Sequence, residues 1–82
     1  MSFENTVKDA FLDTVSGQVE TGNPPEAKAA YDRLIAGGQT HSHALHQLAG
    51  ALRTEMDRML TESTPFDERR YTALLEAITG AE

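Results

Sequence analysis

The chain is 82 residues long, enough for one domain, and carries 13 acidic residues against 7 lysines and arginines. Its hydrophobic content of 39% is too high for a disordered tail. No apolar run reaches the roughly 20 residues that span a bilayer. The net charge of −6 is spread evenly, so no basic patch is predicted to meet a nucleic acid. We expect a single domain, residues 1–82, that binds neither nucleic acid nor membrane.

The sequence contains no cysteine. This excludes disulfides, thiolate metal ligands and a cysteine nucleophile. The first five residues, Met1 to Asn5, have neither the basic nor the apolar segment of a secretory signal. We therefore expect a cytoplasmic protein.

The first predicted helix covers about residues 2–16, with Ser2 as its N-cap. Apolar residues recur in it at spacings of three and four, which places them along one side of a helix: Phe3, Val7, Ala10, Phe11 and Val15. Leu12 points away from that side, so the apolar face is wide. This face either packs between two neighbouring helices of the chain or is partly exposed to a partner. Residues 16–22 are predicted to form a loop.

The second predicted helix covers about residues 24–36, where Asn23 is the predicted N-cap and Pro24 suits the first helical position. The pair Gly37-Gly38 ends it, because glycine tolerates the left-handed conformation found after helices. Its apolar stripe consists of Ala27, Ala30, Tyr31, Leu34 and Ile35.

The third predicted helix covers about residues 41–60, with the hydroxyl of Thr40 as its cap. Its predicted core stripe is Leu45, Leu48, Leu52, Met56 and Met59. Small residues beside the stripe would let another helix approach closely: Ala44, Ala49 and Ala51.

The fourth predicted helix covers about residues 67–79, with Asp67 as N-cap and Gly80 at its end. Phe66 and Tyr71 have the spacing of a hydrophobic staple across this cap. No segment has the alternating pattern and turns of a β-hairpin. The sequence therefore predicts an all-α fold, a small antiparallel bundle of three to four helices.

All three histidines, His41, His43 and His46, lie within six residues at the start of the third helix. Imidazole is the commonest neutral metal ligand, so this group suggests a zinc or nickel site. Helical rotation turns His41 towards the core, and only His43 and His46 can share a face. Two ligands are fewer than a zinc site needs. The competing interpretation is that His41 packs at the helix start while the other two are solvated.

Two further kinds of site are disfavoured by the sequence. Residues 31–48 have the helix, glycine turn and helix of a DNA-binding motif, but Arg53 and Arg58 lie beyond the first turns of the second helix. The carboxylates Glu55 and Asp57 face different directions and are predicted to be solvated, without the convergence that acid–base chemistry requires. No phosphate loop or nucleophile elbow is present. We predict no catalytic residue, no cofactor and no enzymatic activity.

From about residue 22 to 79 the chain resembles short bacterial all-helical domains of unknown function. The residues that carry the resemblance are Asn23-Pro24-Pro25-Glu26, Tyr31-Asp32-Arg33-Leu34, Gly38, Glu55, Pro65-Phe66-Asp67-Glu68-Arg69, Tyr71 and Leu74. The chain departs from that pattern at His41, Ser42 and His43, where acidic residues would follow the cap. The resemblance implies a helical fold and brings no catalytic residue with it.

These observations favour a non-enzymatic protein-interaction module whose partner is another protein or a second copy of the chain. Its predicted contact residues are Phe3, Phe11 and Leu12 on the first helix. The alternative is a small metal-binding protein that uses His43 and His46. A helix-turn-helix nucleic-acid binder is a second alternative, which the acidic charge disfavours.

Overall fold

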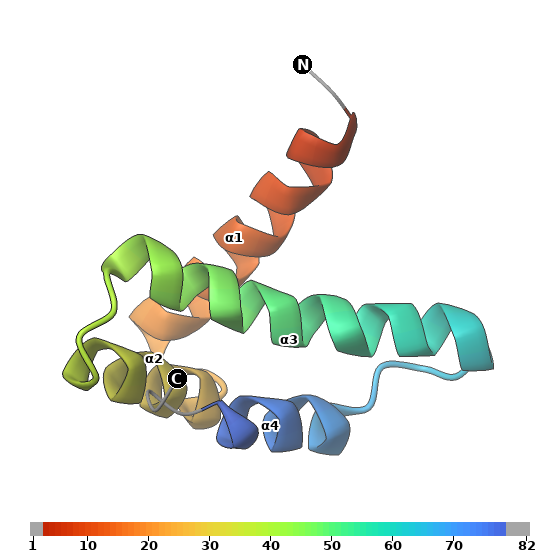
Figure 1. The fold of residues 1–82 in the computed structure, drawn as a ribbon. Coiled ribbons are helices and arrows are strands. Elements are labelled where there is room, and N and C mark those ends of the chain that lie inside the picture. Colours follow the sequence, from red (N-terminus) through yellow and green to blue (C-terminus); the bar gives the residue numbers. More distant parts are fainter. Residues whose placement is uncertain (1–2, 79–82) are drawn as a thin grey trace.

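The computed structural model describes residues 3–78, with side chains described from residue 10 onward. Four helices form: α1 (Phe3–Thr21), α2 (Pro25–Ala36), α3 (His41–Glu62) and α4 (Glu68–Ala77). No strand occurs in this part of the chain, so the predicted all-α bundle is confirmed. α3 contacts each of the other helices; it runs antiparallel to α4, and α1 crosses it steeply (Figure 1).

The core lies where α3 meets the other three helices. Its fully buried side chains come from every helix: Val15, Ala27, Ala30, Leu34, Ala44, Leu48, Tyr71 and Leu75. The alanines among them lack bulk beyond Cβ, so helix backbones can approach closely around the larger leucines. Ala49 and Ala51 are also buried, as their predicted role in close helix packing requires.

The predicted end of the first helix near residue 16 is wrong, because α1 continues to Thr21. Val15 is fully buried and Val19, one turn later, packs against the same core, so burial holds the intervening residues helical. The helix then ends at Gly22, whose φ of 69° is the left-handed conformation that glycine adopts without strain. The predicted cap Ser2 lies outside the described residues.

The bounds of the other three helices agree with the prediction to within two residues. The predicted cap Asn23 is wrong: Pro24 holds the N-cap position of α2, and no side chain caps this helix. Asn23 instead helps to close α1, since its backbone N–H donates to the carbonyl of Gln18. α2 ends at Gly37, and Gly38 then adopts a φ of 96°. The predicted stop at Gly80 lies outside the described residues.

The predicted starts of α3 and α4 are confirmed by their hydrogen bonds. The hydroxyl of Thr40 accepts from the backbone N–H of His43 at 3.1 Å. The carboxylate of Asp67 accepts from the backbone N–H groups of the second and third residues that follow it. The rings of Phe66 and Tyr71 meet edge to face with centroids 5.6 Å apart, as a hydrophobic staple requires.

The predicted core stripe of α3 is only partly correct. Leu48 and Leu52 are buried, but Met56 is exposed and Glu55 is buried in the position next to it. The buried side of the helix is therefore turned towards Glu55, because α4 packs against that side and supplies a charged partner. Among residues 3–78, no helix is long and apolar enough to cross a membrane.

Candidate functional site

The histidines at the start of α3 do not converge on one point. His41 is exposed, yet its Nδ1 lies 2.8 Å from the Tyr31 hydroxyl, and the two rings meet edge to face. His46 has its Nδ1 2.7 Å from the carbonyl of Ser42, one turn earlier in the helix. His43 is exposed. Tyr31 thus ties the first histidine to α2, away from the other two.

A metal site built on His43 and His46 lacks a third ligand in the described part of the chain. No group of three histidine, aspartate or glutamate side chains there is placed to hold a metal ion. His46 Nδ1–H donates to the carbonyl of Ser42, which orients the ring and leaves Nε2 as the ring atom available to a ligand. Metal binding by these two residues stays a prediction.

The predicted contact residues on α1 divide into two groups. Phe11 and Leu12 are half-buried and pack against the core of their own chain, so they present little free surface. The wide apolar face of the helix therefore covers neighbouring helices at this level. The side chain of Phe3 lies outside the described residues.

A more exposed apolar surface lies on α3, along one stripe that includes Ala49, Leu52, Met56 and Leu60. Exposure rises along this stripe, from 9% at Ala49 and 7% at Leu52 to 38% at Met56 and 82% at Leu60. The first two residues belong to the core, while the last two extend beyond it. We call Met56 and Leu60 the uncovered stripe.

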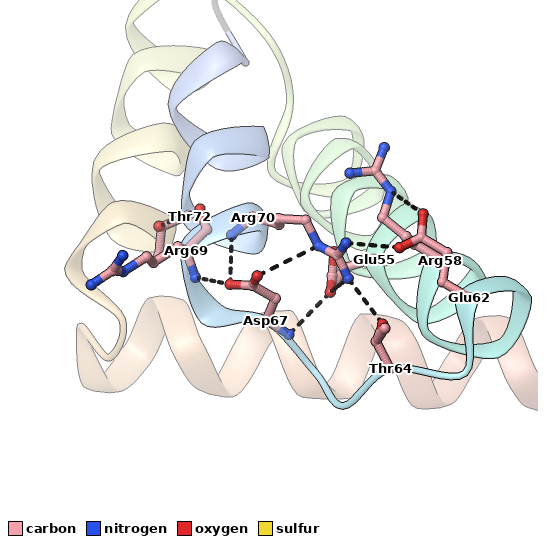
Figure 2. A network of polar contacts seen from close by, with 8 residues as sticks. All are labelled: Glu55, Arg58, Glu62, Thr64, Asp67, Arg69, Arg70 and Thr72. Atoms are coloured by element: carbon pink, nitrogen blue, oxygen red, sulfur yellow. Dashed lines mark hydrogen bonds and ion pairs between the residues drawn. The ribbon is translucent and has the colours of Figure 1, made fainter.

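An adjacent side of the same part of α3 carries a buried charge. Glu55 is fully buried, and its Oε2 accepts from the Asp67 backbone N–H at 3.0 Å and from Arg70 Nη2 at 3.1 Å. Arg70 also donates to Glu62 at 3.1 Å and to the Thr64 hydroxyl at 3.3 Å (Figure 2). These bonds join α3, the connection after it and the first turn of α4.

The network is electrostatically strong but incompletely satisfied. The hydrogen bond that Arg70 donates to the Glu55 carboxylate is the main cause that raises the pKa of Arg70, so the guanidinium stays charged. Glu55 Oε1 and Arg70 Nε are buried without a hydrogen-bond partner. Such atoms cost stability, which indicates that the ion pair serves to position α4 on α3 more than to stabilise the bundle.

The prediction that Glu55 is solvated is wrong, because its side chain is fully buried. A signal for its burial was present, because Glu55 follows Leu48 by seven residues and Leu52 by three, on one side of the helix. Its partner Arg70 lies 15 residues away in the next helix. No local pattern joins these two, so the pair becomes visible only when α3 and α4 are packed.

Two other polar contacts fasten the helices around this region. The Tyr71 hydroxyl donates to Gln18 Oε1 at 2.6 Å and so joins α4 to α1. Arg33 of α2 donates to the carbonyls of Leu75 and Ile78 at the end of α4. Each of these side chains positions a helix.

No family model, curated protein or solved structure matches this chain. The chain is a small all-helical domain of four helices, and the comparisons identify no family for it. Any function has to be argued from the surfaces of the molecule itself.

Proposed function

We propose that this chain is a non-enzymatic protein-interaction module that binds its partner through α3. The supporting observation is the uncovered stripe, in which Met56 and Leu60 continue the apolar side of α3 beyond the core. Single exposed leucines are common on protein surfaces. Here the exposed residues continue a stripe that is buried one turn earlier. Such a pattern is typical of a helix face that becomes buried when a partner binds.

The chemistry of the residues fits this role. Met56 has an unbranched, polarisable side chain that adapts to differently shaped partners. Leu60, at 82% exposure, would transfer nearly its whole apolar surface out of water on binding. Fully burying a leucine contributes about 1.5–3 kcal/mol, so two or three such contacts support a weak, reversible association.

The test is photo-crosslinking in cells of the chain's own host. A benzophenone amino acid is placed at Leu60 in one variant and at Thr61, an exposed neighbour about 100° around the helix, in the control. We expect a protein adduct from position 60 that position 61 yields weakly or not at all. Equal or absent adducts at the two positions would remove the proposed function.

A further inference from the structure

The start of α3 carries two exposed histidines on one side of the helix. His43 and His46 are three residues apart, which places them about 60° from each other around the helix, with their Cβ atoms about 5–6 Å apart. A bond from an imidazole nitrogen to a metal ion is about 2 Å long. Two imidazoles at this spacing can therefore reach the same ion.

The ring of His46 is already oriented for a metal ion. Its Nδ1 lies 2.7 Å from the carbonyl oxygen of Ser42. A carbonyl only accepts, so the ring proton is on Nδ1 and the free lone pair is on Nε2. Histidines that bind metals commonly donate their other ring nitrogen to a backbone carbonyl, which fixes the tautomer and the direction of the ring. Because side chains in a helix lean towards its N-terminus, the ring lies over the turn that carries His43.

The backbone beneath the two rings is held in place. The Thr40 hydroxyl accepts from the backbone N–H of His43 at 3.1 Å, so the first turn of α3 is capped. On the other side of the same turns, Ala44 and Leu48 are fully buried in the bundle. The exposed ring of His43 needs only a rotation about its own side-chain bonds to meet an ion bound to His46.

The third histidine does not join this pair. His41 Nδ1 lies 2.8 Å from the hydroxyl of Tyr31, and the two rings meet edge to face beside α2. In the described part of the chain no carboxylate completes a group of three ligands either. The chain therefore supplies two imidazoles, and water takes the remaining positions around the ion.

The kind of ion follows from this ligand set. Imidazole suits Cu²⁺ and Ni²⁺, which accept tetragonal or octahedral surroundings in which water fills the open positions. A structural Zn²⁺ site needs four protein ligands, and Mg²⁺ prefers oxygen. The positive end of the α3 dipole opposes any cation here, while the net charge of −6 attracts cations to the whole molecule. Neither effect selects a metal, so affinity and selectivity have to come from the two imidazoles.

We propose that His43 and His46 form a binding site for a Cu²⁺ or Ni²⁺ ion, with Nε2 of His46 and one ring nitrogen of His43 as its protein ligands. The site lies at the start of α3, whereas the uncovered stripe lies near the end of that helix (Figure 1). It is therefore independent of the proposed interaction module, and either can fail without the other.

The first test is calorimetric titration of the full chain, without a histidine tag, with nickel chloride. His43→Ala and His46→Ala should each weaken binding by about tenfold or more, and His41→Ala is the matched control that should bind like the wild type. All three side chains are exposed, so the variants should keep the circular-dichroism spectrum of the fold. Equal binding by the three variants, or a wild type that binds no more tightly than His43→Ala, would overturn the site.

The second test counts the imidazole ligands directly. Electron spin-echo modulation of Cu²⁺ bound to the wild type should show two imidazoles, and either single substitution should leave one. The count on the wild type needs no variant, so it stands even if a substitution disturbs the start of α3. A single imidazole in the wild type would refute the pairing of His43 with His46.

Discussion

Glu55 and Arg70 place a charge where the neighbouring residues are apolar. Leu48, Ala51 and Leu52 lie on the same buried side of α3 as Glu55, and transferring a carboxylate there from water is costly. The cost is offset by Arg70, whose side chain keeps 27% of its surface exposed, and by the Asp67 backbone N–H. Replacing Glu55 by glutamine removes the charge and keeps the shape of the side chain, so its effect measures the cost of leaving Arg70 without its buried anionic partner.

We predict that Glu55→Gln lowers the free energy of unfolding by about 1.5–3 kcal/mol, the range for hydrogen bonds to charged groups. Asp57→Asn is the matched control, because Asp57 is 67% exposed and only meets Arg53 at 3.9 Å. The control should change stability by less than about 0.5 kcal/mol. Urea denaturation measures both variants, and equal effects would contradict the role given to Glu55.

Tyr71 provides a second prediction, in which stability depends on pH. Burial raises the pKa of its hydroxyl above the ordinary value of about 10, so the folded state favours the neutral form. That contribution is complete below about pH 10 and is lost as the pH rises through the raised pKa of the folded state. The wild type should therefore lose stability on titration above pH 10.

Tyr71→Phe should remove this alkaline loss and cost about 0.5–1.5 kcal/mol at neutral pH, since the hydrogen bond to Gln18 disappears. Thermal unfolding at pH 7 and at several values above pH 10 measures both effects. Tyr31→Phe is the control and should keep the alkaline loss of the wild type. If Tyr71→Phe keeps it as well, another group is responsible.

At the scale of the element, the length of α1 is decided by a competition between the burial of its apolar residues and the weak helix propensity of residues such as Gly17. The helix runs through Gly17, a residue that favours helix ends, because Val15 and Val19 on either side pack into the core. A Cβ added at Gly17 would meet nothing within 4 Å. The glycine is thus an unfavourable helix residue that no close contact requires.

Gly17→Ala should accordingly raise the free energy of unfolding by about 0.5–1 kcal/mol. Gly22→Ala, in a position with a φ of 69°, should instead lower it, because a side chain strains that conformation. Chemical denaturation compares the two. A Gly17→Ala variant that is less stable than the wild type would mean that α1 ends before Gly17.

At the scale of the whole molecule, the net charge of −6 opposes association between copies. Salt screens this repulsion, with a Debye length of about 30 Å at 0.01 M and about 10 Å at 0.1 M. If the partner is a second copy of the chain, raising sodium chloride from 10 to 150 mM should strengthen their association several-fold, as sedimentation equilibrium would show. Weakening by salt would indicate that ion pairs hold the copies together instead of the apolar stripe.

The sequence by itself determined the four helices and most of their ends. Thr40 and Asp67 cap as predicted, Phe66 packs on Tyr71, and α2 ends at the predicted Gly37-Gly38 pair, since each of these features joins residues a few positions apart. Local chemistry decides such features because the chain brings these groups together in any helix that forms there.

The tertiary structure alone decided the extension of α1, the burial of Glu55 and the exposure of Met56 and Leu60. The spacing of residues shows that a stripe is apolar, but it does not show how much of its length a neighbour covers. The covered length of a stripe depends on where helices distant in sequence cross. The burial of a charge such as Glu55 depends on a partner from another helix, here Arg70. For this reason the sequence pointed to α1 for partner contacts, while the packed bundle added the far end of α3 as a candidate surface.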